Sequence, residues 1–444
     1  MTEEKRAVWG WALYDWANSA FATTVMAGFF PIFFKQYWSY GADVNVSTAQ
    51  LGFGNSLASL FVALIAPILG AAADKGSAKK KFLIFFAYLG VLMTAALFLV
   101  EKGAWAWAIF IYAMGTVGFA GANVFYDSLL PTVAGKDRID SVSGLGFGMG
   151  YLGGGLLFAL NVAMVQFPHI FGIADAGLAV KYSFLSVAIW WGLFTLFTIF
   201  WVKEEKQQLH TDEVHLFVDG FRQLAATFRE IRYLKTLFLF LIAYWLYIDG
   251  VDTIIKMAVD YGLSLGFDDS DLILALLIVQ FIGFPAAILY SKLGEKWGVR
   301  KAIFLAIGVY SAVTLWGMMM TNRNEFYLLA VVIGLVQGGI QALSRSYYSR
   351  LIPVGREGEF YGFYNMLGKF AAIVGPALMG IVGLAVKRIL MPPSPTEMQL
   401  VEIGRLASRW SIGSILILFV AGAILLYLVD EEKGERETAL LEAQ

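Results

Sequence analysis

Long apolar runs separated by short polar segments occupy most of the chain. Each run reaches about 20 residues, the length that an α-helix needs to cross the hydrocarbon core of a bilayer. The pattern therefore predicts an all-α membrane protein with twelve transmembrane helices. We expect these helices at 8–34, 49–73, 82–100, 104–128, 141–165, 182–202, 236–259, 271–291, 302–321, 326–349, 361–386 and 409–430.

Composition and charge strengthen this interpretation. Hydrophobic residues make up 59% of the chain and charged residues 15%, against roughly 45–50% and about 25% in soluble proteins. The chain has no cysteine, so disulfides and thiol chemistry are excluded. Lysine and arginine are concentrated at both ends and in every second loop, which predicts a cell (inner) membrane protein with both termini in the cytoplasm.

One motif occurs in both halves of the chain. The segment GAAADKGSAKK at 70–80 returns as SKLGEKWGVRK at 291–301, each time between one apolar run and the next. Asp74 of the first copy corresponds to Glu295 of the second, and two basic residues close both copies. Duplicated helical halves around a central site are the architecture of secondary transporters.

The repeat also predicts the domain organisation. We expect two pseudo-symmetric six-helix bundles, at 1–202 and 236–430, joined by the segment 203–235. Aromatic and aliphatic residues recur at helical spacing in this linker, beside arginines, which predicts an amphipathic helix on the cytoplasmic surface; a calmodulin-type target would have the same pattern. The polar tail at 431–444 is predicted to be cytoplasmic and disordered.

Three strings in the chain are distinctive: LYDWANSAFATTV at 13–25, YWLYIDGVDTI at 244–254 and GLVQGGIQALSRS at 334–346. They resemble signatures of the vacuolar amino-acid effluxer family, the autophagy-related permeases and their bacterial relatives, within the major facilitator superfamily. The resemblance covers nearly the whole chain. It implies the major facilitator fold and export of amino acids or similar small metabolites, and we expect a monomer that works by alternating access.

Polar residues inside the first predicted helix mark a candidate substrate site. An ionisable group at the bilayer centre costs roughly 2.5–3.5 kcal/mol, so such groups are retained where they have a role. Asp15 and Asn18 are three residues apart and share a helix face, which should continue through Ala22 and Val25. This face supplies an anion and a polar neighbour.

The tenth predicted helix carries the complementary chemistry. Gln337, Gln341 and Arg345 form a stripe at successive i+4 spacing, with two amides and a guanidinium suited to a carboxylate. Together with Asp15 and Asn18, they predict binding of a zwitterion such as an amino acid. The alternative is that Asp15 only pairs structurally and Arg345 only forms part of a gate.

The seventh predicted helix contains the candidates for proton coupling. Asp249, Asp252 and Lys256 share one face, and Asp252 can pair with Lys256 at i+4. Two carboxylates on one face inside a membrane repel each other, which favours protonation of one of them. The three histidines lie in predicted loops, so a histidine relay is excluded. Interhelical ion pairing with a purely structural role is the alternative.

Several charged residues near the cytoplasmic ends of predicted helices are candidates for gating. Asp74 of the repeated motif can cap a helix or pair with a basic residue, and Glu295 is its degenerate counterpart. In the superfamily that the chain resembles, the fourth, fifth, tenth and eleventh helices line the cytoplasmic gate. This implies that Asp127, Arg345 and Lys369 close it, with purely structural ion pairs as the alternative.

Other function classes fit the sequence less well. Gly148, Gly150 and Gly153 match GxGxxG, but no strand precedes them, so they do not indicate nucleotide binding. No cluster of histidine or cysteine and no nucleophile with a base is visible, which argues against an enzyme. We expect no metal, no cofactor and no nucleic-acid partner. The remaining alternative to a carrier of small molecules is a channel or lipid scramblase with the same cavity. Midplane charges of both signs favour alternating access.

Overall fold

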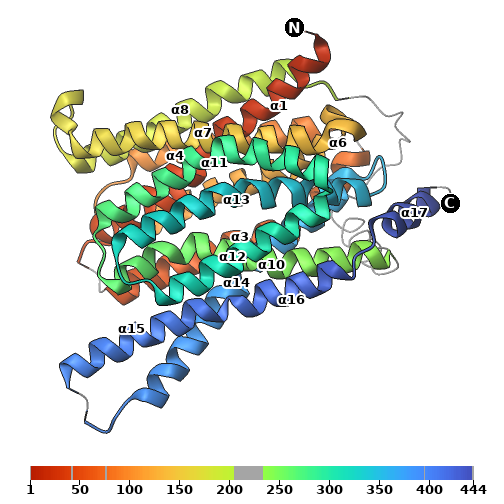
Figure 1. Cartoon of the computed structure of the whole chain (residues 1–444). Helices are drawn as coiled ribbons and strands as arrows, with labels where there is room; N and C mark the ends of the chain where they lie inside the picture. Colours follow the sequence, from red (N-terminus) through yellow and green to blue (C-terminus); the bar gives the residue numbers. More distant parts are fainter. Residues whose placement is uncertain (1, 42–43, 76–77, 205–233, 395, 443–444) are drawn as a thin grey trace. The chain divides into compact units, whose positions relative to one another are not determined.

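The protein is almost entirely helical in the computed structural model, which describes residues 2–41, 44–75, 78–204, 234–394 and 396–442 (Figure 1). The regular structure within these residues consists only of helices, which confirms the all-α prediction. The linker helix expected between 203 and 235 falls almost wholly outside the described residues.

Two compact units make up the described chain. The first contains α1 to α8 together with Ile352–Met366, and the second contains α10 to α13 together with the described residues after Met366. The division falls inside α14, whose first turns therefore group with the helices of the N-terminal half.

The helices of the first unit run in sequence order. They are α1 (Glu3–Ala20), η1 (Phe21–Phe29), α2 (Phe30–Phe33), η2 (Phe34–Trp38), α3 (Val44–Lys75), α4 (Lys79–Ala96), η3 (Leu97–Leu99), α5 (Trp105–Ser128), α6 (Leu130–Ala134), η4 (Lys136–Arg138), α7 (Ile139–Gln166), η5 (Pro168–Phe171) and α8 (Ala176–Trp201). Helix α1 packs against α7 and α8, while α4 packs against α5 and α8 (Figure 1). Small residues permit the closest of these contacts, since a Cβ at Gly118 of α5 would lie 2.4 Å from the backbone nitrogen of Gly90 on α4.

The second unit is built from long helices and a short C-terminal one. They are α10 (Lys235–Leu265), α11 (Asp269–Trp297), α12 (Val299–Met319), α13 (Arg323–Leu351), α14 (Glu357–Leu390), α15 (Glu397–Ser414), α16 (Leu416–Tyr427) and α17 (Glu431–Glu442). Helix α13 packs against α11 and α12, and α10 packs against α16.

Ten helices in the described residues are long and apolar enough to cross a membrane. They correspond to ten of the expected segments, with α15 and α16 together forming the last one. The second and eleventh expected segments lie within α3 and α14, which contain 32 and 34 residues. The count of twelve spans stays a prediction.

The first transmembrane helix differs from the regular α-helix that the sequence predicts. After Ala20 the chain adopts a π-helical path over Phe21–Phe29, and again over Phe34–Trp38. Pro31, which has no amide hydrogen to donate, lies between these two π segments in α2. The expectation that the face of Asp15 and Asn18 continues through Ala22 and Val25 at α-helical spacing is therefore wrong.

The C-terminal tail is also more ordered than its composition predicts. Glu431–Glu442 forms helix α17, which packs against α10 and α13. The Glu437 carboxylate accepts a hydrogen bond of 3.0 Å from the Thr236 amide at the start of α10, and the Thr438 hydroxyl donates to the Leu351 carbonyl. Arg350 forms an ion pair of 3.1 Å with Glu431. The prediction of disorder is wrong here because α17 satisfies polar groups at the ends of two longer helices.

Candidate functional site

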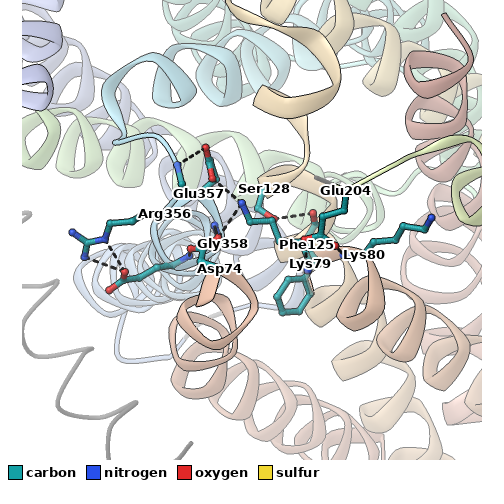
Figure 2. Close-up of polar contacts among 11 residues, drawn as sticks. Asp74, Lys79, Lys80, Phe125, Ser128, Glu204, Arg356, Glu357 and Gly358 are labelled. Carbon is teal, nitrogen blue, oxygen red and sulfur yellow. Dashed lines mark hydrogen bonds and ion pairs between the residues drawn. The ribbon is translucent and has the colours of Figure 1, made fainter. Parts of the chain in front are cut away.

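The repeated motif of the first half meets the beginning of α14 (Figure 2). Asp74, near the end of α3, accepts hydrogen bonds from the backbone amides of Gly358 at 2.9 Å and Glu359 at 2.8 Å, one on each carboxylate oxygen. The first amides of a helix have no partner within the helix, and the helix dipole favours a negative charge beside them. Asp74 therefore caps α14 from a different helix, within the first unit.

Lys79 forms ion pairs with two carboxylates at the start of α14. Its ammonium group lies 3.0 Å from Asp74 and 2.7 Å from Glu357 (Figure 2). The exposed fractions of these side chains are 10% for Lys79, 7% for Asp74 and 9% for Glu357. Removal of Lys79 would leave both carboxylates buried without a cation. We call these three side chains the Asp74 cluster.

Close backbone packing accompanies the Asp74 cluster. A Cβ at Gly70 would lie 2.0 Å from the Gly358 carbonyl oxygen, and a Cβ at Gly358 would lie 2.6 Å from the Gly70 carbonyl oxygen. One turn further along, a Cβ at Gly362 would lie 2.5 Å from the Cα of Pro67. Helix α3 and the start of α14 thus approach each other at a distance that only glycine permits.

A second acidic residue organises the beginning of α4. Glu204 accepts hydrogen bonds from the backbone amides of Lys79 at 2.8 Å and Lys80 at 3.1 Å. The Lys80 ammonium group donates to the Val202 carbonyl at 2.7 Å. The sequence analysis did not single out Glu204, Glu357 or Gly358. A glycine followed by Arg-Glu-Gly-Glu and an apolar run was the available signal for the start of α14, since acidic residues favour the first turn.

The second copy of the motif has a different environment. Glu295 lies on the exposed side of α11, close to its end. The chain turns at Gly298, whose φ of 94° suits glycine, and α12 begins directly afterwards. Arg300 donates a hydrogen bond to the Val429 carbonyl. This copy therefore contacts the end of α16, whereas the first copy contacts α14.

Asp127 of α5 and Asn365 of α14 form a further contact within the first unit. Asp127 is buried, and the Asn365 amide group donates to its carboxylate at 3.1 Å. The side chain of Lys369, one turn after Asn365, lies outside the described structure. Arg345 of α13 is 3% exposed. The proposed gate of Asp127, Arg345 and Lys369 stays a prediction.

The polar face of α1 lies against α5 and α7. The Asp15 carboxylate accepts hydrogen bonds from the Ser19 and Tyr126 hydroxyl groups, both at 3.2 Å. The Asn18 amide group donates to the Asn123 side chain at 2.6 Å. Asp15 is half-buried and Asn18 is buried. Helix α5, together with Ser19 of α1 itself, thus fixes the orientation of the polar groups that the sequence selected.

Glycines of α7 make room for this polar face. A Cβ at Gly150 would lie 3.0 Å from an Asp15 carboxylate oxygen, and a Cβ at Gly146 would lie 2.6 Å from the Tyr126 hydroxyl oxygen. Trp11 stacks on the Tyr126 ring with centroids 4.2 Å apart and donates to the Tyr126 carbonyl. The glycine-rich string that mimics a nucleotide motif therefore has a packing role beside Asp15.

The three candidates on α10 differ in burial. Asp249 is 1% exposed, Asp252 is half-buried and Lys256 is exposed. Asp249 accepts hydrogen bonds from the Thr253 hydroxyl at 3.2 Å and from the Gly375 backbone amide of α14 at 3.0 and 3.1 Å. Both donors are uncharged.

The stripe on α13 faces inward. Gln337 and Arg345 are buried, and Gln341 is half-buried. Neighbouring Ser344 shares a hydrogen bond of 2.7 Å with the Tyr247 hydroxyl of α10. The stripe therefore lies on a buried part of α13, next to a hydrogen bond between α13 and α10.

Comparison with known families decides the identity of the chain. The family model described as "Vacuole effluxer Atg22 like" matches residues 3–389. The chain belongs to this family. A relative in Bacillus subtilis (strain 168), described as an uncharacterized MFS-type transporter, YxiO, is 38% identical over 425 residues, covering 95% of this chain and 94% of the relative. Autophagy-related protein 22 of Coccidioides immitis (strain RS) is 22% identical, covering 98% of this chain and 88% of that protein.

Solved structures place the Atg22-like chain in the major facilitator fold. The human organic anion transporter MFSD10 (TETRAN) superposes with a TM-score of 0.70 at 14% identity, covering 96% of this chain and 100% of that one. The proton:xylose symporter XylE superposes with a TM-score of 0.67 at 15% identity, covering 99% and 98%. The protein is a multi-pass membrane transporter of the major facilitator superfamily and not an enzyme.

Proposed function

We propose that this Atg22-like transporter exports amino acids or similar small zwitterions by proton-coupled alternating access. It works as a monomer in the cell membrane, with both termini in the cytoplasm. The family description supports the direction of transport, since it names an effluxer. The distribution of lysine and arginine supports the orientation.

The Asp74 cluster is the main observation in support of alternating access. It joins three buried charged side chains and two backbone amides at the start of one transmembrane helix. A permanently open pore has no need of such a device, whereas a carrier that switches between two conformations can make and break it as a unit. We assign the Asp74 cluster and the Asp127 contact with Asn365 to gating, together with Arg345, Lys369 and the exposed Glu295.

Substrate recognition is assigned to one polar face in each unit. In the first unit, Asp15 is oriented by two hydroxyl donors and can accept an ammonium group beside Asn18. In the second unit, Gln337, Gln341 and Arg345 supply donors suited to a carboxylate. A zwitterion satisfies both kinds of group, and an uncharged sugar satisfies neither charge.

Proton coupling is assigned to the acidic face of α10. Asp249 is buried with uncharged hydrogen-bond donors, and Asp252 and Lys256 lie near enough to interact with it electrostatically. Within the described residues, uncharged groups donate to this carboxylate, so it can take up and release a proton without breaking a direct ion pair there. This is the property that a proton-coupled carrier requires.

The test is a ligand screen followed by flux measurements. The purified protein is heated with each of the twenty amino acids, with glucose and with an organic anion such as succinate. A ligand that binds the folded state raises the melting temperature by mass action. We expect a group of amino acids to stabilise the protein and Asp15→Ala and Arg345→Lys to weaken that effect. Stabilisation by glucose alone would overturn the proposed substrate class.

Flux distinguishes a carrier from a channel or scramblase. Proteoliposomes loaded with the stabilising amino acid and the pH dye pyranine should show saturable efflux accompanied by proton movement. Flux that rises linearly with concentration, without proton movement, would support a channel instead.

A further inference from the structure

Asp249 of α10 accepts a hydrogen bond from the backbone of α14 at Gly375. Both of its carboxylate oxygens lie within 3.1 Å of the Gly375 amide nitrogen, at 3.0 and 3.1 Å. The Thr253 hydroxyl, one turn further along α10, donates to the same carboxylate at 3.2 Å. All three residues are in the second unit. The contact is therefore a hydrogen bond between a buried acid of α10 and the backbone of α14.

The contact lies next to a proline inside α14. Gly375 immediately precedes Pro376, which lies inside the helix. Proline has no amide hydrogen and its ring crowds the carbonyl four residues earlier, so helices bend or kink at such positions. The amide next to this weak point donates to Asp249. The carboxylate can thus influence how the two segments of α14 are held on either side of Pro376.

The packing permits only glycine at the contact. A Cβ at Gly375 would lie 1.9 Å from the Thr253 hydroxyl oxygen and 2.9 Å from an Asp249 carboxylate oxygen. A Cβ at Gly380, also on α14, would meet nothing within 4 Å. Glycine at 375 is therefore required for the approach of α14 to α10, whereas glycine at 380 is not.

Among the described residues, the charged groups that act on Asp249 lie on its own helix. Asp252 and Lys256 of the same helix act on it electrostatically. Helix α16, which packs against α10 through Phe419 beside Gly250, carries no charged side chain. Buried Arg345 is on α13, and the side chain of Lys369 on α14 is not described.

We propose that Asp249 is a proton-binding site whose protonation loosens α14 at Gly375 and Pro376. The inference rests on the proposed function, because it supplies the step by which proton binding would change the conformation. In the ionised state, the negative carboxylate accepts a charge-assisted hydrogen bond from the Gly375 amide. A proton arriving from water converts the carboxylate to a carboxyl group. The hydrogen bond then becomes a weaker neutral one, and α14 bends more freely at Pro376.

The experiment measures bending of α14 directly as the pH changes. The chain has no cysteine, so spin labels can be placed at Leu384→Cys on α14, beyond Pro376, and at Ile424→Cys on α16. Both native side chains are exposed, at 71% and 59%. Double electron–electron resonance is recorded in lipid nanodiscs at pH 5 and pH 8. A pair at Leu315→Cys on α12 and Ile424→Cys serves as the control that does not involve α14.

We expect the distance distribution of the α14 pair to shift between the two pH values and that of the control pair to stay fixed. Asp249→Asn cannot ionise, so it should abolish the shift and hold the low-pH distribution at both values. Asp252→Asn should retain the shift. A shift that persists unchanged in Asp249→Asn, or the absence of any shift in the protein with native Asp249, would overturn the inference.

A second pair of variants separates the backbone contact from the charge. Gly375→Ala should displace α14 from Asp249 and remove the pH-dependent shift, whereas Gly380→Ala should leave it unchanged. Proton movement in the pyranine assay tests the proposed function separately. Proton-coupled efflux without an Asp249-dependent shift of α14 refutes only the inference. Efflux without proton movement refutes the proposed coupling itself.

Discussion

The two copies of the repeated motif have similar sequences but different contacts. Asp74 is buried at the start of α14 and bound to two backbone amides and a lysine. Its counterpart Glu295 lies exposed on α11. The basic residue near the end of the motif differs as well, since Lys79 completes a charge cluster and Arg300 donates to the Val429 carbonyl.

This difference shows that two copies of one loop motif can make different contacts. The partner of each copy decides its electrostatic role. In the first copy, glycine at position 70 permits backbone contact with Gly358, so the carboxylate reaches the helix terminus. In the second copy, Ser291 occupies the corresponding position and the acidic residue remains in contact with water.

The largest expected effect comes from removing the buried acid. Asp74→Ala should lower the free energy of unfolding by about 2–5 kcal/mol, because it removes the acceptor of the buried Gly358 and Glu359 amides and one of the two carboxylates that pair with Lys79. Glu295→Ala is the matched control and should change that free energy by less than about 0.5 kcal/mol. Denaturant titration of both purified variants measures the contrast. Equal losses would contradict the assigned difference between the copies.

Exchanging the leading residue of each motif tests the packing part of the comparison. Gly70→Ser should lower the free energy of unfolding by about 1–3 kcal/mol, since its Cβ would overlap the Gly358 carbonyl. Ser291→Gly should lower it by about 0.5–1 kcal/mol, through helix flexibility alone. Melting temperatures recorded side by side provide the comparison. A tolerated Gly70→Ser would show that α3 and α14 need no such close approach.

The smallest expected effect concerns the basic residue of the second copy. Arg300→Ala removes one hydrogen bond to the Val429 carbonyl, for which we expect a loss of about 0.5–1.5 kcal/mol in the free energy of unfolding. Lys301→Ala removes the adjacent exposed basic residue and should have less effect. Transport in the pyranine assay should be retained in both variants. Loss of transport in Arg300→Ala would extend the gating role in the second copy from Glu295 to Arg300.

Sequence reasoning located the important acids but not all their partners. Asp74 was found through the internal repeat, yet the amide it binds lies 284 residues away, beyond the reach of any local pattern. Asp249 was selected because a carboxylate inside an apolar run requires a reason, and its partner Gly375 lies on a different helix. That these residues touch depends on how α10 and α14 pack, which periodicity does not specify.

The errors of the sequence analysis have physical causes too. The regular helical face in the first helix ends because the chain changes from an α-helix to a π-helix at Phe21, and a fixed 3.6-residue period does not predict such a change. The tail was expected to be disordered because it is polar, but α17 gains stability from helix ends that it caps. Composition describes a segment in isolation, whereas capping depends on distant backbone groups.

The dependence of the first unit on Ile352–Met366 has a consequence for biosynthesis. At about 5–20 residues per second, a ribosome needs roughly 15–60 s to add the residues between Asp74 and its amide partners. During that interval the N-terminal helices are already inserted, but the acid and its lysine have no helix terminus to bind. The first unit therefore cannot form all its contacts when the N-terminal half has been translated. The contacts of Asp74 form only after most of the second half has been synthesised.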